Sequence, residues 1–113
     1  MPCLASQKNA GYWTSSAGKV FHDGMDDPIS WSYPSNQTAW LGCHPGDVRD
    51  ENGNYCGLTE NSTLPYTDED LALAEGLKRM QLAHASGRPW FVSIGVHRPH
   101  TTLRVPAGFP GPE

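Results

Sequence analysis

The chain has 113 residues, of which 37% are hydrophobic and 18% charged, and its net charge is −4. No stretch approaches the roughly 20 apolar residues of a membrane-spanning helix, and no cluster of Lys and Arg could follow a nucleic-acid backbone. We therefore expect no membrane span and no nucleic-acid partner. Any anion site must be built locally from a few cations.

The first elements predicted along the chain are a helix and then a strand. The helix ends at Asn9 or Gly11, and a short strand begins at Tyr12, which gives half of an α/β unit. Gly18-Lys19-Val20-Phe21-His22 follows. Lysine can hold a tetrahedral anion as a point charge, and histidine can donate to an oxygen or transfer a proton. Lys19 and His22 are thus candidates for binding a sulfate or phosphate ester, unless they lie on a solvated turn.

Residues 23–65 are predicted to form a long loop excursion over the surface. Their composition is dominated by Gly, Pro, Asn, Asp and Ser, with no helical or alternating period. A connection of this length usually forms a functional loop, a tethered segment or a covering for a larger body. Asp26 and Asp27 resemble a metal-binding acid pair, but Pro28 follows them, so we interpret them as solvated turn residues.

The same excursion carries signals of the secretory pathway. Asn36 and Asn61 each begin an Asn-x-Ser/Thr glycosylation acceptor, and Cys43 and Cys56 bracket a polar loop that a disulfide could close. The cysteines could also stay free, and the acceptors could arise by chance. The first residues, from Met1 onward, lack the basic start and apolar stretch of a secretory signal.

A helix is predicted to begin at Thr67, whose side chain can cap it and which is followed by three acids that favour the helix dipole. Leu73, Leu77 and Met80 recur at helical spacing. We expect them to form the packed face of the helix, while the opposite face is exposed to solvent. Gly87 is expected to end the helix. Lys78 and Arg79 lie toward the C-terminal end, where cations are favoured.

The apolar run Trp90–Val96 is typical of a strand buried on both faces of a parallel sheet. His97-Arg98-Pro99-His100 follows at once, at the strand end where α/β sheets place ligands. A metal bound by His97 and His100 is possible but disfavoured, because zinc sites use three or four protein ligands and no His-Glu-x-x-His or Cys-x-x-Cys motif is present. His97 is the stronger functional candidate, and His100 and Arg98 would hold the loop. Residues after His100 are expected to be loop.

Taken together in this order, the Gly18–His22 segment, the cysteine pair, the helix, the apolar strand and His97–His100 resemble the sulfatase family. The resemblance implies an α/β fold like alkaline phosphatase, in which residues 1–113 form part of a large mixed, mainly parallel sheet with flanking helices. It also supports a Cys43–Cys56 disulfide. By motif match, Lys19 would contact sulfate oxygens, His22 would orient or deprotonate a formylglycine hydrate, and His97 would assist the leaving alcohol.

Other parts of the family's pattern have no match in this chain. The family's nucleophile is a cysteine in Cys-x-Pro/Ala-Ser-Arg that is oxidised to formylglycine, whereas Cys3-Leu4-Ala5-Ser6-Gln7 lacks the arginine and lies too near Gly11. The acids that would bind the family's calcium ion are also absent, so no metal ligand is assigned. We therefore expect an internal fragment of a sulfatase catalytic domain that is inactive by itself.

The parent enzyme implied by this resemblance hydrolyses sulfate esters of saccharides such as glycosaminoglycans and is secreted or lysosomal. Two alternatives remain open from the residues. The chain could be a non-catalytic binding module that keeps this piece of the fold. It could also derive from a phosphatase or phosphodiesterase of the same superfamily.

Overall fold

The computed structural model describes residues 2–22, 24–36, 43–62 and 67–106, which form a mixed α/β arrangement. Two sheets are present in these ranges, one with two strands and one with three. None of the helices in these ranges is long and apolar enough to cross a membrane. The elements are, in chain order, α1 (Pro2–Asn9), β1 (Trp13–Gly18), the 3-10 helix η1 (Pro28–Ser30), β2 (Val48–Arg49), β3 (Tyr55–Gly57), α2 (Asp68–Ala85), β4 (Trp90–Gly95) and β5 (Leu103–Val105).

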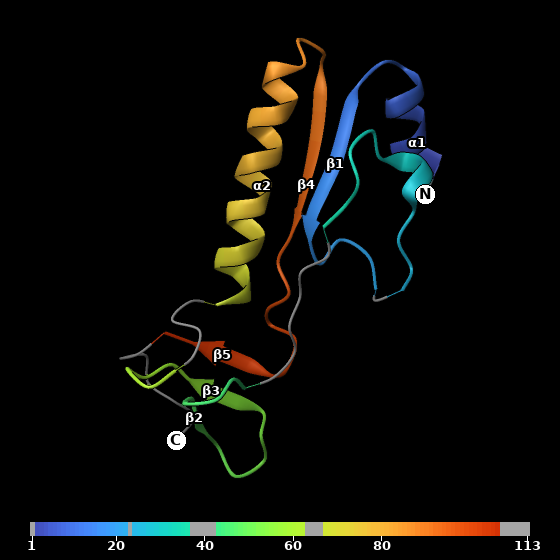
Figure 1. The fold of residues 1–113 in the computed structure, drawn as a ribbon. Helices are drawn as coiled ribbons and strands as arrows, with labels where there is room; N and C mark the ends of the chain where they lie inside the picture. The colour runs from blue at the N-terminus through green and yellow to red at the C-terminus, as the bar shows by residue number, and fades with distance from the viewer. Residues whose placement is uncertain (1, 23, 37–42, 63–66, 107–113) are drawn as a thin grey trace.

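The larger unit consists of two parallel strands with a helix along one face. β1 pairs with β4 in register from Trp13 opposite Trp90 to Gly18 opposite Gly95. α2 runs antiparallel to both strands, and the three-stranded sheet lies beyond their carboxyl ends (Figure 1). The predicted helix-to-strand start and the parallel strand at Trp90 are confirmed, although the first strand begins at Trp13 rather than Tyr12. The prediction that the second strand is buried on both faces was wrong, because Trp90 is exposed and the rest of β4 is half-buried.

The predicted ends of α2 are also confirmed. Thr67 and Asp70 form a reciprocal capping box, in which the Thr67 amide N–H donates to Asp70 Oδ2 at 2.8 Å. This arrangement satisfies backbone donors that the first helical turn leaves unpaired. Gly87 has a φ of 67°, a left-handed conformation that glycine adopts without strain and that ends the helix.

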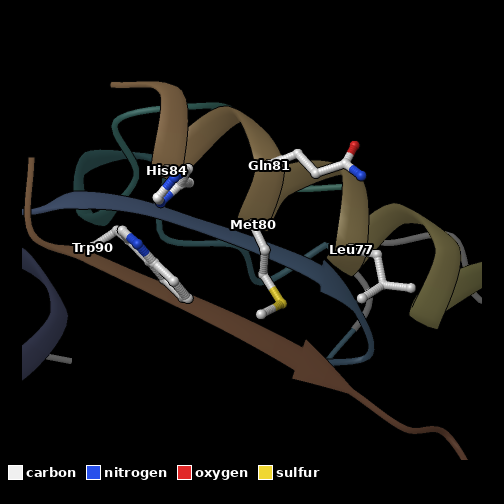
Figure 2. A pocket seen from close by; sticks show the side chains of 5 residues that line it. All are labelled: Leu77, Met80, Gln81, His84 and Trp90. Atoms are coloured by element: carbon white, nitrogen blue, oxygen red, sulfur yellow. The ribbon is translucent and has the colours of Figure 1, made fainter. Parts of the chain in front are cut away.

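The prediction of which face of α2 packs was wrong. The buried residues are Ala72, Gly76, Arg79 and Ala83, whereas Leu73 is 52% exposed. Ala72, Gly76 and Ala83 are small residues on one face of the helix, and they let it lie close to the two strands. The larger apolar residues instead border an open surface lined by Leu77, Met80, Gln81, His84 and Trp90 (Figure 2).

Arg79 lies on this buried face and links α2 to β1. It is only 4% exposed. Its Nε donates to Ser15 Oγ at 3.0 Å, its Nη2 donates to the Pro34 carbonyl at 3.0 Å, and its Nη1 donates to Glu75 Oε2 at 2.5 Å. A buried guanidinium needs such partners to offset its desolvation. This pairing satisfies the buried Ser15 hydroxyl of β1, while the neighbouring Thr14 hydroxyl donates to the Ser30 carbonyl at 2.7 Å.

α2 approaches the sheet closely where Gly76 faces Ile94, and a substitution there can test this packing. A Cβ at Gly76 would lie 2.3 Å from Ile94 Cδ1. We expect Gly76→Ala to destabilise the fold by about 1 kcal/mol, because overpacking of about 1–3 kcal/mol exceeds the roughly 1 kcal/mol that alanine gains in helix propensity. Thermal unfolding followed by circular dichroism measures the change. In an Ile94→Ala background the same substitution should stabilise the fold, and destabilisation there would contradict this explanation.

The smaller sheet is built largely from the predicted loop excursion. β2 pairs antiparallel with β3, and β3 pairs parallel with β5, so residues 103–105 form a strand where loop was expected. The predicted disulfide between Cys43 and Cys56 is present, and it attaches the preceding segment to β3. β5 was not predicted because a three-residue strand contains too little alternation to recognise without its partner.

Asp26 and Asp27 are half-buried and organise their turn, which differs from the solvated turn that we expected. The indole Nε1–H of Trp31 donates to Asp26 Oδ1 at 2.9 Å, and the Ser30 hydroxyl donates to Asp27 Oδ2 at 2.6 Å. Trp31 is thereby held in a buried position, 4% exposed, where its ring meets that of Phe21 edge to face. These acids fix the loop that leads away from His22.

Candidate functional site

The carboxyl ends of β1 and β4 lie side by side because each strand ends on glycine. Gly18 and Gly95 are register partners, and the Lys19 amide N–H donates to the Gly95 carbonyl at 2.9 Å. A Cβ on Gly95 would lie 2.0 Å from the Lys19 carbonyl oxygen, so a larger residue does not fit this close approach. Lys19 and the segment that carries His97 therefore leave the sheet at one edge (Figure 1).

Lys19 and His22 interact directly. Lys19 Nζ lies 3.3 Å from His22 Nδ1. An ammonium group can only donate, so His22 Nδ1 accepts this hydrogen bond and the ring proton of neutral His22 is on Nε2. Because His22 is exposed, this pair presents a positive charge and an N–H donor to solvent, and both are groups that a tetrahedral oxyanion can use.

His97 is buried without a hydrogen-bond partner among the described residues. It is 7% exposed, and both of its ring nitrogens are buried and unpaired in those ranges. Buried polar side chains are nearly always hydrogen-bonded, so an imidazole in this state needs an explanation such as a bound ligand or a catalytic role. The His100 ring lies near it, with 4.8 Å between ring centroids.

The surroundings of His97 favour its neutral form. Burial lowers the pKa of His97 below its usual value, and the nearby charges of His100, Arg98 and Lys19 lower it further, while Glu69 opposes them. A bound anion would counter these cations and restore proton affinity to the ring.

Glu69, in the first turn of α2, holds the backbone next to His97. The Arg98 amide N–H donates to Glu69 Oε1 at 3.2 Å, and Arg98 Nη1 lies 3.7 Å from the same oxygen. The sequence indicated only that this acid favours the helix dipole. No local spacing could have revealed a contact between residues 29 positions apart.

Comparison with known proteins identifies the relatives of this chain. No protein-family model matches the sequence. The chain is 30% identical to iduronate 2-sulfatase of Mus musculus over an alignment of 122 residues, which covers 90% of this chain and 21% of the relative. The human enzyme matches equally, at 30% identity with the same coverage. The chain is homologous to iduronate 2-sulfatase. It spans about a fifth of the length of these relatives.

Sulfatase homology confirms the resemblance drawn from the two short motifs. The structure brings the residues proposed from those motifs to one end of the paired strands: Lys19 contacts His22, and its charge acts on His97. The catalytic and substrate-binding roles of these residues remain predictions.

A calcium site is not formed by the residues that the structure describes. In those ranges no group of three or more His, Cys, Asp or Glu side chains converges as a metal ion would require. Within the described ranges, the side chains therefore do not fit the calcium ion that the sulfatase resemblance implies.

The two predicted glycosylation sites differ in their surroundings. Asn61 is exposed in a turn, whereas Asn36 is half-buried and its backbone bridges to Ala17 of β1. The hydroxyl residues of both acceptors, Thr38 and Thr63, lie outside the described residues. A glycan is sterically easier to place on Asn61, and both sites remain predictions.

Proposed function

We propose that Lys19, His22 and His97 form the sulfate-binding and acid–base part of a sulfatase active site, in a chain that corresponds to part of an alkaline phosphatase-like catalytic domain. The observation that carries this proposal is the His97 ring, which is buried and has no hydrogen-bond partner among the described residues, beside a strand end whose charges include Lys19. Homology to iduronate 2-sulfatase supports the sulfate-ester substrate class, and sulfated saccharides such as glycosaminoglycans are the proposed source of the ester.

Each side chain has a role that its geometry allows. Lys19 holds the sulfate charge, and His22 Nε2–H donates to a sulfate oxygen from the same side. Cations and donors aimed at the charge that develops during transfer are effective stabilisers of a transition state. When the sulfate charge raises the proton affinity of His97, the protonated ring can give its proton to the leaving alcohol.

The reaction also requires a nucleophile, which we do not assign in this chain. In the sulfatase family that group is a formylglycine made from cysteine, and Cys3 does not match its motif. The proposal therefore concerns binding and proton transfer by these residues. Complete hydrolysis by the 113-residue chain is not expected.

The disulfide and the exposed Asn61 support a location in the secretory pathway, outside the cell or in the lysosome. Disulfides persist in oxidising compartments and are rare in the cytosol.

Sulfate binding tests the proposed site. We expect inorganic sulfate to shift the NMR signals of Lys19, His22 and His97, and we expect Lys19→Ala to raise the Kd about tenfold or more, because a hydrogen bond to a charged group contributes about 1.5–3 kcal/mol. Lys78→Ala is the matched control, since it removes the same charge from a lysine whose side chain is 61% exposed on α2.

Two results would change the proposal. If Lys19→Ala and Lys78→Ala bind sulfate equally well, Lys19 does not hold the anion. Inorganic phosphate should be titrated in parallel. A site that binds phosphate much more tightly than sulfate at the same ionic strength would favour the phosphatase or phosphodiesterase alternative.

A further inference from the structure

His97 lies in a short segment between β4 and β5, and Glu69 of α2 contacts this segment at Arg98. Glu69 accepts the Arg98 amide N–H at 3.2 Å and lies 3.7 Å from the Arg98 guanidinium. The Glu69 side chain is 24% exposed, so both contacts are partly shielded from water. Glu69 Oε1 therefore helps to hold the peptide group that directly follows His97, whose carbonyl also accepts the His100 amide N–H at 3.2 Å.

The backbone that carries Glu69 is itself held in place. It occupies the first turn of α2, and the capping box of Thr67 and Asp70 fixes this turn. Along α2, Gly76 and Arg79 hold the helix against the sheet. The position of Glu69 is therefore set by the same two strands whose ends carry Lys19 and His97.

Glu69 also balances charge around His97. In the part of the chain that the structure describes, the charges that act on the ring are those of Lys19 after β1, Arg98 and His100 beside it, and Glu69 on α2. Three of these groups are basic, and Glu69 is the acid among them. The Glu69 carboxylate can stabilise the protonated His97 ring by its negative charge, while sulfate binds on the side of Lys19.

From these contacts we propose that Glu69 is a positioning residue, which holds the His97 ring in the anion site through the Arg98 amide and guanidinium. The importance of this role for catalysis rests on the proposed function. The structural part of the role, the link from Glu69 to the backbone beside His97, can be measured without any substrate.

Two substitutions separate the geometry from the charge. Glu69→Gln removes the charge and keeps a carbonyl oxygen that can accept the Arg98 N–H, whereas Glu69→Ala removes both. We expect amide hydrogen exchange of Arg98 to become about five to ten times faster in Glu69→Ala and to change less in Glu69→Gln, as loss of one hydrogen bond to a charged acceptor implies. Glu51→Gln, in the exposed turn between β2 and β3, is the control for net charge.

A purely electrostatic role predicts a different pattern. Both Glu69 variants lose one negative charge, so both would bind inorganic sulfate equally well or more tightly than the unchanged chain. Positioning predicts that Glu69→Ala binds sulfate at least threefold more weakly than Glu69→Gln. NMR titration of the His97 ring should show a lower pKa in both variants, and no such change in Glu51→Gln.

Equal Arg98 exchange and equal sulfate affinity in Glu69→Ala and Glu69→Gln would overturn the positioning role. Circular dichroism of each variant shows whether α2 is intact, and Glu69→Gln, which keeps the acceptor, provides the comparison if Glu69→Ala unfolds. Failure of the proposed function gives a distinct result. In that case sulfate shifts no signal in the unchanged chain, while Arg98 exchange and the His97 titration still report on Glu69.

Discussion

Replacing Arg104 by alanine is expected to destabilise the β2-β3-β5 sheet by about 3–5 kcal/mol, the usual loss when one partner of a buried ion pair is removed. Arg104 Nε donates to Asp47 Oδ2 at 2.8 Å and its Nη2 donates to Asp47 Oδ1 at 3.1 Å. Both side chains are 0% exposed. Without the arginine, Asp47 would keep a buried charge with only its hydrogen bonds from Ser62 and the His44 amide.

Amide hydrogen exchange in the small sheet measures this effect locally. The Leu58 amide donates to the Val105 carbonyl at 2.9 Å, so its exchange reports on the pairing of β3 with β5. We expect strongly reduced protection of Leu58 in Arg104→Ala. The double variant Asp47→Leu/Arg104→Met removes both charges and should recover most of the loss, as apolar replacements of buried ion pairs often do. If Arg104→Ala keeps the protection of Leu58, the pair does not stabilise this sheet.

The same pair predicts a pH dependence. Burial alone would raise the pKa of Asp47, but hydrogen bonds from Arg104, Ser62 and the His44 amide, together with the charge of Arg104, lower it from 3.8 to about 2. Because the pKa is lower in the folded chain, the folded state favours the ionised carboxylate. This contribution, about 2 kcal/mol, is fully present above pH 4 and is lost as pH falls toward 2. The double variant should lack this acid transition.

Signals encoded in neighbouring residues predicted the elements that position the site. The cap at Thr67, the glycine at Gly87 and the apolar run from Trp90 each depend on residues close together in the sequence, and all three were confirmed. The packing face of α2 was wrong because it depends on how near the sheet lies. Ile94 occupies the space above Gly76, so a small-residue stripe faces the strands and the leucines face outward.

The candidate site could be predicted only in part for the same reason. Lys19, His22 and His97 each lie in a short motif, so residue types and a family resemblance identified them. Glu69 and the Asp47–Arg104 pair act across long separations, 29 and 57 residues, and neither has a local signature. Their roles follow from the folded arrangement, in which the end of β4 passes the first turn of α2 and β5 lies beside β3.

Gly95→Ala is expected to separate the ends of β1 and β4 and to weaken sulfate binding with little change elsewhere in the chain. A Cβ on Gly95 would lie 2.0 Å from the Lys19 carbonyl oxygen and 2.6 Å from the Val20 amide nitrogen. These are backbone atoms, which cannot move aside by changing a rotamer. We expect a loss of about 3 kcal/mol, at the upper end of the usual cost of overpacking.

The substitution also tests the geometry of the site, because the displaced backbone carries Lys19. The Lys19 amide would lose its hydrogen bond to the Gly95 carbonyl, and the lysine would move away from His97. Gly57→Ala is the matched control in a strand, since its Cβ would meet no atom closer than 3.5 Å. Thermal unfolding and sulfate titration should therefore be affected in Gly95→Ala and nearly unchanged in Gly57→Ala. Equal sulfate affinity in the two variants would show that the close approach of the strand ends is unnecessary for the anion site.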